Sequence, residues 1–264
     1  MRGARQASRR RRIEKQDVLA IEQRAGVKPP KTRRRCALDQ VDGQYYEVAS
    51  PGTLSEKIVT FARDRIYADF LKFCAPTPTD TILDVGVSDV VTDSANVLER
   101  RYSPQERITA VGLGAGRDFT ATFPKVRYRR IIPNEPLPFE DGTFDVVTSN
   151  AVIEHVGSLE NQRFFVSELL RVGGRVFITA PHRYFPVEPH TGIPFLHWSD
   201  ASFKLACGWL GKEKWVEAEN LILMTQQRLK ETCPEGANVK IGPTGLLLGP
   251  CSSNLYLFSP GHRG

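Results

Sequence analysis

The sequence predicts an α/β fold: a seven-stranded, mostly parallel sheet with helices on both faces and an antiparallel C-terminal strand. Between residues 54 and 212, short apolar runs alternate with segments whose apolar residues recur at helical spacing. This alternation is typical of parallel sheets covered by helices. Two further apolar runs, Asn238–Ile241 and Leu255–Phe258, lie close together near the C-terminus. Their spacing favours an antiparallel pair at the sheet edge.

The first predicted helix runs to Cys74, where two nearby prolines end it. Thr53 and Glu56 form a capping box at its start. Its apolar residues fall on one helical face. They are Ile58, Ala62, Ile66 and Phe70.

The five remaining strands are apolar runs bounded by glycine, proline or polar turns. They cover 81–87, Ile108–Leu113, Val126–Ile132, Phe144–Ser149 and Arg175–Ala180. Helices are predicted around 94–102, over Leu159–Arg171 until Gly173 and Gly174 break it, and over Asp200–Leu210. The last helix has an apolar stripe that we expect to pack in the core rather than touch lipid. The stripe comprises Phe203, Leu205, Ala206, Trp209 and Leu210.

Charge divides the chain into two parts. Residues 1–35 hold 13 Lys and Arg against 3 Asp and Glu, whereas residues 36–264 hold 23 against 27. We expect residues 1–40 to be a basic, disordered tail and residues 45–264 to be one domain. The run Arg9–Arg12 could bind nucleic acid or an acidic membrane surface, but a solvated tail is the favoured interpretation.

Hydropathy and cysteine spacing narrow the class of protein. No apolar run approaches the roughly 18–20 residues that span a bilayer, and we expect a cytoplasmic protein without a transmembrane segment. The five cysteines are odd in number and lack C-x-x-C spacing, so they indicate neither a disulfide framework nor a zinc site.

The segment Thr81–Asp89 predicts where a ligand binds. An apolar strand carrying Asp84 ends at Gly86, which lets the backbone approach a ligand closely because it lacks a Cβ. The helix that follows has N–H groups without partners at its start. Ligands bind at this edge of open α/β sheets.

Three later blocks give this turn a context: Leu137–Val147, Asn150–His155 and Glu168–Val172. With the first strand, they resemble class I S-adenosylmethionine-dependent methyltransferases of the type 11-like group. The resemblance covers about residues 54–182. It implies a Rossmann-like sheet, methyltransferase activity and S-adenosylmethionine as cofactor. A dehydrogenase is less favoured, since no G-x-G-x-x-G follows the first strand.

The resemblance also implies a set of cofactor-binding residues. They are Asp84, Gly86, Ser88, Asp89, Gly112, Asn134, Phe139 and Asn150. Three positions depart from the family pattern: Ser88 replaces a glycine, Gly112 replaces the acid that binds the ribose, and Pro133 replaces an Asp near the adenine. Asp89 could replace the missing acid, and Asn134 could contact the adenine.

The acceptor side is predicted from histidines. His155 is a candidate general base, although a role in capping or packing the next helix is the favoured alternative. Residues 182–198 follow the fifth strand and are rich in histidine, aromatics and proline, which suggests a substrate lid extending to about residue 212. His182, His190 and His197 are its candidate substrate residues. Glu188, His190 and His197 match no standard metal site, so we expect no metal.

These observations favour a methyltransferase acting on a small molecule or on a lipid or sugar intermediate. One alternative is an RNA methyltransferase whose arginine-rich tail holds phosphates. Another is a degenerate, non-catalytic methyltransferase fold that serves as an interaction module.

Overall fold

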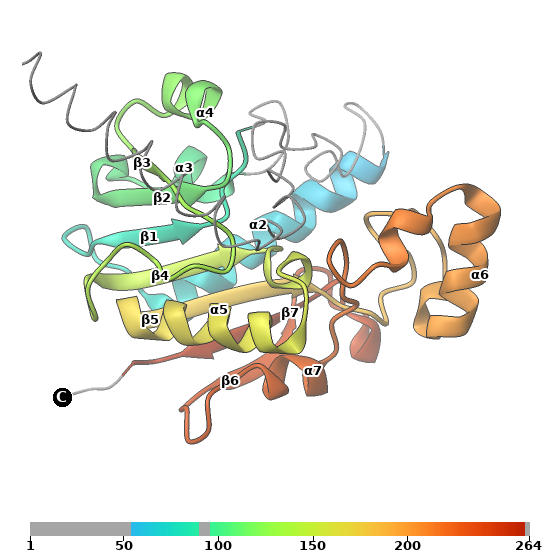
Figure 1. The fold of residues 1–264 in the computed structure, drawn as a ribbon. Coiled ribbons are helices and arrows are strands. Elements are labelled where there is room, and N and C mark those ends of the chain that lie inside the picture. The colour runs from blue at the N-terminus through green and yellow to red at the C-terminus, as the bar shows by residue number, and fades with distance from the viewer. Residues whose placement is uncertain (1–53, 90–95, 262–264) are drawn as a thin grey trace, which may run out of the picture. The chain divides into compact units, whose positions relative to one another are not determined.

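The computed structural model describes residues 54–89 and 96–261. Seven strands form one sheet in the order β3-β2-β1-β4-β5-β7-β6 (Figure 1). Their bounds are β1 Ile82–Val85, β2 Ile108–Gly112, β3 Arg127–Arg130, β4 Phe144–Asn150, β5 Gly173–Pro181, β6 Lys240–Thr244 and β7 Asn254–Ser259. The first five are parallel, whereas β7 runs antiparallel to both β5 and β6. The predicted fold class is confirmed.

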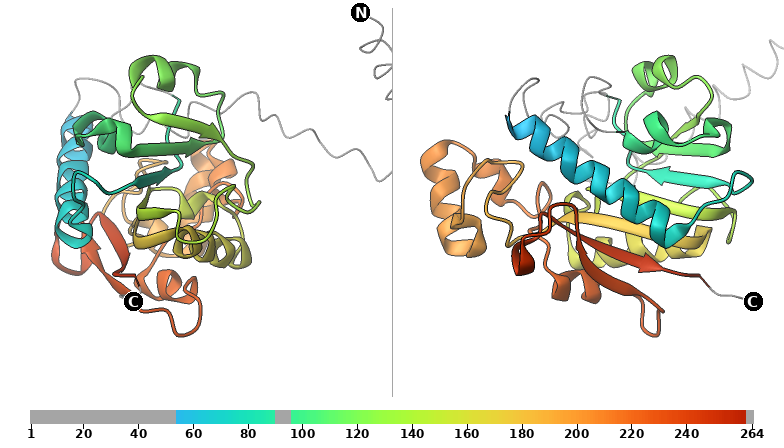
Figure 2. Two further views of the ribbon diagram at one scale, coloured as in Figure 1. Left: turned by 90° about the vertical axis from the view of Figure 1, so that its left-hand side faces the viewer. Right: turned by 180° about the vertical axis from the view of Figure 1, so that it is seen from behind.

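Six α-helices accompany these strands within the described residues. Their bounds are α2 Leu54–Cys74, α3 Val97–Arg101, α4 Arg117–Thr122, α5 Leu159–Val172, α6 Asp200–Leu210 and α7 Gln226–Glu231. Helix α2 lies on one face of the sheet and α5 on the other (Figure 2). No helix within residues 54–89 and 96–261 is long and apolar enough to cross a membrane.

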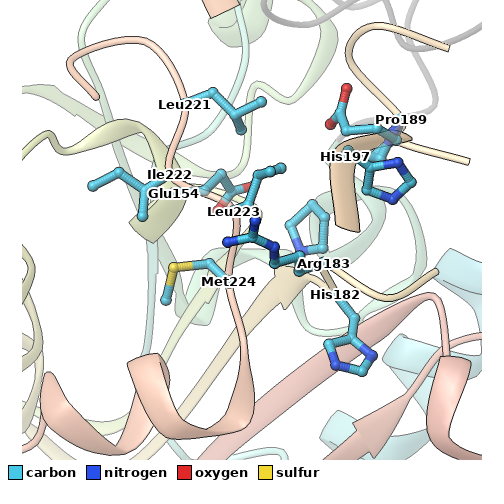
Figure 3. Close-up of a pocket in the computed structure, with 11 residues that line it drawn as sticks. Glu154, His182, Arg183, Pro189, His197, Leu221, Ile222, Leu223 and Met224 are labelled. Carbon is cyan, nitrogen blue, oxygen red and sulfur yellow. The ribbon is translucent and has the colours of Figure 1, made fainter. Parts of the chain in front are cut away.

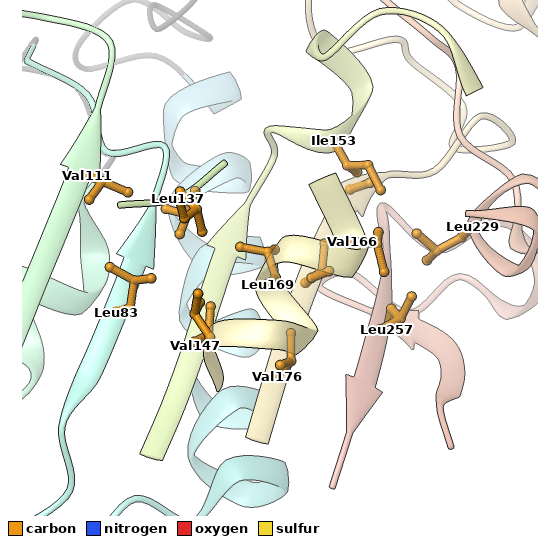
Figure 4. Close-up of a cluster of buried hydrophobic side chains, with 14 of the residues drawn as sticks. Leu83, Val111, Leu137, Val147, Ile153, Val166, Leu169, Val176, Leu229 and Leu257 are labelled. Carbon is orange, nitrogen blue, oxygen red and sulfur yellow. The ribbon is translucent and has the colours of Figure 1, made fainter. Parts of the chain in front are cut away.

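Two apolar cores result, because successive strand residues point to opposite faces. Val147 and Val176 pack with Val166 and Leu169 of α5 (Figure 4). Their neighbours Val146 and Phe177 pack on the other face, in the cluster that contains Ile66 and Phe70 of α2. Both faces of the central strands are therefore covered, which explains why successive residues such as Val146 and Val147 of β4 are both apolar.

Helix α2 begins and ends close to the predicted positions. Ala62, Ile66 and Phe70 are buried as expected, but Ile58 is exposed, so the predicted apolar face is too long by one turn. Thr53 lies outside the described residues, and so does the side chain of Glu56. The predicted capping box stays a prediction.

Helix α6 corrects a second expectation. Phe203 and Ala206 are buried in a small core with Ile193 and Trp215. Leu205, Trp209 and Leu210 are exposed, with Trp209 at 82%. The prediction that the whole stripe packs in the core is wrong, because only Phe203 and Ala206 of its five residues are buried.

Candidate functional site at the carboxyl edge of the sheet

The segment after β1 is held against β2 by backbone hydrogen bonds. The N–H groups of Gly86 and Val87 both donate to the carbonyl of Val111, at 2.8 and 3.1 Å. Gly86 has a φ of 96°, in the left-handed region that glycine tolerates. A Cβ there would lie 2.3 Å from a methyl group of Val152, after β4. This turn therefore requires glycine, because of its backbone conformation and because Val152 leaves no room for a side chain.

Ser88 and Asn96 hold the next part of the segment. The N–H of Ser88 donates to the side-chain oxygen of Asn96, whose amide donates back to the carbonyl of Ser88. Both residues are buried. A polar, small residue fits where the family pattern has glycine, and its backbone rather than its hydroxyl makes these two bonds.

Gly112 ends β2 where the family pattern places an acid. A Cβ at Gly112 would approach the carbonyl oxygen of Val87 to 2.8 Å, closer than a Cβ can lie to a backbone atom without a shift. The backbone of the β1 segment thus occupies the space of a side chain at this strand end.

A carboxylate nevertheless lies beside that end, supplied by Asp89. Its two oxygens accept hydrogen bonds from the N–H groups of Gly116 and Phe119, both at 3.0 Å. It thereby caps the start of α4. Each oxygen of a carboxylate can accept more than one hydrogen bond, so capacity for a ligand hydroxyl remains.

Asp84 and Glu99 form a buried pair of carboxyl groups below this segment. The two groups interact electrostatically, and neither carboxylate oxygen of Glu99 has a hydrogen-bond partner among the described residues. Burial raises the pKa of Asp84 to about 7. Burial, and then the charge of Asp84, raise the pKa of Glu99 well above its ordinary value. Two neighbouring carboxyl groups with raised pKa values cannot both ionise at low cost, so the pair shares a proton.

The other predicted cofactor residues are spread along the edge. Asn150 ends β4, and its side-chain oxygen accepts a hydrogen bond from Thr179. Asn134 is exposed in a turn with a φ of 59°. Phe139 packs edge-on against Phe144 and beneath the guanidinium of Arg129. These contacts give Phe139 a packing role, and they leave the cofactor roles of all three as predictions.

His155 ends the short 3-10 helix η3 (Ile153–His155) after β4, and it meets His190 from the loop after β5. Their Nε2 atoms are 3.2 Å apart. The Nδ1 of His155 lies 2.6 Å from the carbonyl of Asn220, to which it donates. The Nδ1 of His190 lies 2.7 Å from the Glu188 carboxylate.

The charges of this group are coupled. Burial, followed by the charge of His190, lowers the pKa of His155 to about 4. Burial also opposes the charge of His190, but the hydrogen bond to Glu188 and the charges of Glu188 and Glu154 together outweigh burial and raise the pKa of His190. Beside them, Glu154 is fully buried, and burial raises its pKa to about 7. Neither of its carboxylate oxygens has a hydrogen-bond partner among the described residues.

A narrow pocket adjoins this group and contains two of the predicted substrate residues. Glu154, His182, Glu188 and His197 are among its lining residues (Figure 3). His182 is buried and lies 3.2 Å from the carbonyl of Ser252, and His197 donates to the carbonyl of Phe185. The structure thus brings the three predicted histidines to one region, with His190 on the His155 side.

Glu154 and Glu99 were not predicted as site residues. Glu99 lies in a segment with a helical pattern and Glu154 in an apolar one. Nothing in either pattern indicates that the glutamate side chain is buried. Asn220, whose carbonyl orients His155, contributes only backbone and leaves no signal in the sequence. The one available signal was the adjacency of Glu154 and His155 directly after a strand.

The sequence and the fold were compared with known proteins. Residues 83–178 match a family model described as a methyltransferase domain. No curated protein matches the sequence. Several solved structures are similar at low identity. A SAM-dependent methyltransferase from Aquifex aeolicus is 13% identical with a TM-score of 0.48, covering 82% of this chain and 96% of that one.

Two further structures show the same level of similarity. A SAM-dependent methyltransferase from Methanosarcina mazei is 15% identical with a TM-score of 0.46, covering 73% of this chain and 95% of that one. Geranyl diphosphate C-methyltransferase from Streptomyces coelicolor, solved with Mg²⁺, geranyl diphosphate and S-adenosyl-L-homocysteine, is 16% identical with a TM-score of 0.44. The coverage is 80% of this chain and 85% of that one.

Proposed function

We propose that this protein, which carries a class I S-adenosylmethionine-dependent methyltransferase domain, methylates a small molecule or a lipid or sugar intermediate. The domain, its enzyme class and its cofactor are those predicted from the sequence, and the family match over residues 83–178 confirms them. The class of acceptor molecule is what we propose here. The observation that carries it is the narrow, histidine-lined pocket beside His155, at the same sheet edge as the β1 segment.

The chain's own residues fit the cofactor. Gly86 provides the required turn, and the pinned backbone of Val87 and Ser88 provides a fixed surface at the strand end. Asp89 provides a carboxylate for the ribose hydroxyls in place of an acid at Gly112. We assign Asp84, Asn134, Phe139 and Asn150 to the same site. When bound, S-adenosylmethionine supplies a reactive methyl group on its sulfonium sulfur.

The remaining task of the protein is to place the acceptor atom in line with that methyl group. His182, His190 and His197 are the proposed contacts for the acceptor. His155 is proposed to take the proton of an acceptor hydroxyl at Nε2, because its Nδ1 already donates to Asn220. We further propose residues 182–212 as the substrate-binding insertion and the cytoplasm as the site of action.

The charge of residues 1–35 is the one observation that favours an RNA acceptor. These residues lie outside those the structure describes. The two acceptor classes can be separated by an assay of the full chain.

The assay measures S-adenosylhomocysteine released from S-adenosylmethionine with small hydroxyl, amine, sugar and lipid acceptors in one arm and RNA in the other. We expect release with a small acceptor, and a loss of at least tenfold in kcat for His155→Gln. Release with RNA alone, steeply weakened by salt and by deletion of residues 1–35, would contradict the proposal.

A further inference from the structure

Three side chains of the acceptor region turn their ligand atoms toward one another. Glu154 and His155 come from η3, and His190 comes from the loop after β5. One carboxylate oxygen and two ring nitrogens from these residues all lie within 4.8 Å of one another. The side chains are 0%, 19% and 7% exposed.

The hydrogen bonds at the far side of each ring fix which nitrogen faces the group. His155 donates from Nδ1 to the carbonyl of Asn220, and His190 donates from Nδ1 to Glu188. In the neutral rings each Nε2 therefore carries a lone pair, and these two atoms are 3.2 Å apart. Such a pair is satisfied either by a proton on Nε2 of His190 or by a metal ion that both nitrogens bind.

Glu154 adds a fully buried carboxyl group to the same place. Its Oε1 lies 3.8 Å from Nε2 of His155, and neither oxygen has a hydrogen bond among the described residues. A buried carboxylate without a partner is strongly disfavoured. A cation beside both imidazoles would remove this penalty.

We propose that Glu154, His155 and His190 bind one divalent transition-metal ion of the zinc class. Two nitrogens bound at the usual zinc distance in a tetrahedral arrangement are about 3.3 Å apart, close to the observed separation. The set of two histidines and one carboxylate favours a transition metal over magnesium, which prefers oxygen ligands.

The surroundings also match a metal site. Ligating histidines usually donate their second N–H to a carboxylate or a carbonyl, which orients the ring and strengthens the ligand. Glu188 does this for His190, and its other oxygen is held by the N–H and hydroxyl of Thr191. Asn220 does it for His155. This places Glu188 as a positioning residue for the metal.

The proposal revises the expectation of no metal and changes the role of His155. A base and a ligand use the same lone pair on Nε2, so His155 can act as a base only in the metal-free chain and acts as a ligand when the ion is bound. Three protein ligands leave a coordination position for water or for an acceptor atom. Binding of an acceptor atom at the open coordination position rests on the proposed function. Metal binding itself does not, because it does not require methyl transfer.

The test is a metal titration of the full chain after treatment with a chelator. We expect Zn²⁺ to bind at one equivalent per chain, measured by competition with a chromophoric chelator. Binding should weaken at least 100-fold in Glu154→Gln and in His190→Gln. Glu99→Gln is the matched control, because Glu99 is also fully buried but lies outside the group. It should bind as the wild type does.

A second measurement uses the wild-type chain alone, so it tests the proposal even if the variants fold poorly. Co²⁺ added to the wild-type chain should give the visible absorption of a four-coordinate ion with nitrogen and oxygen ligands, without the near-ultraviolet bands of thiolate ligands. Absence of one tight equivalent in the wild type, thiolate bands, or unchanged binding in both folded variants would overturn the proposal. Binding of S-adenosylhomocysteine, measured in parallel, separates this outcome from a failure of the proposed function.

Discussion

The carboxylate of Asp89 is held by two backbone N–H groups of the segment after β2. This placement explains how a glycine can stand at the end of β2. The backbone at Val87 leaves no space for a side chain at Gly112, and the acid comes from the neighbouring segment instead. At the scale of single residues, we propose that Asp89 takes the role of the acid that the family pattern places at the end of β2.

The buried pair of Asp84 and Glu99 predicts a pH dependence of stability. Burial raises the pKa of both carboxyl groups in the folded chain, that of Asp84 to about 7. Between pH 4 and 7 the folded state therefore holds protons that the unfolded state has released. Stability from this pair is present at low pH and is lost as pH rises toward 7.

Glu99→Gln isolates this effect. Urea unfolding across pH 4–7 should show the variant gaining free energy of unfolding relative to the wild type as pH rises. Glu106→Gln is the control, since Glu106 is exposed on the segment just after α3. A difference between Glu99→Gln and wild type that stays constant with pH would contradict the shared proton.

At the scale of elements, helix α6 has large apolar side chains on both its buried and its exposed side. Phe203 is buried beside Trp215, whereas Trp209 is 82% exposed. Phe203→Ala should lower the free energy of unfolding by about 3–5 kcal/mol, as for other buried aromatic residues. Trp209→Ala should change it by less than about 0.5 kcal/mol. Equal losses in urea denaturation would show that Trp209 packs in the folded protein.

The strands and the long helices were predictable because their pattern is local. Strand β4 and helix α5 lie within one residue of their predicted ends, because the apolar run of β4, the helical spacing of α5 and the two glycines after α5 are all local features of the sequence. Helices α4 and α7 were missed. Each has six residues, too few to display a period, and α4 is capped by Asp89 from a distant segment.

At the scale of the whole molecule, the site is assembled from segments far apart in the chain. His155 and His190 are 35 residues apart, and Asn220 is 65 from His155. The family resemblance predicted that ligands bind at the carboxyl edge of the sheet. The sequence also identified the histidines as candidate acceptor-site residues. The packing of the loops after β4 and β5 decides which histidines come into contact and buries Glu154 among them. No local sequence pattern specifies that packing.

Calorimetric titration with S-adenosylhomocysteine tests the central claim most directly. We predict binding in the micromolar range for the wild type. Gly86→Arg should abolish it, because a side chain there would meet Val152 and the ligand surface. Gly208→Arg should leave it unchanged, since a Cβ at that exposed helical position has nothing within 4 Å. No binding at millimolar ligand by the folded wild-type chain would contradict the claim that this protein is a working methyltransferase.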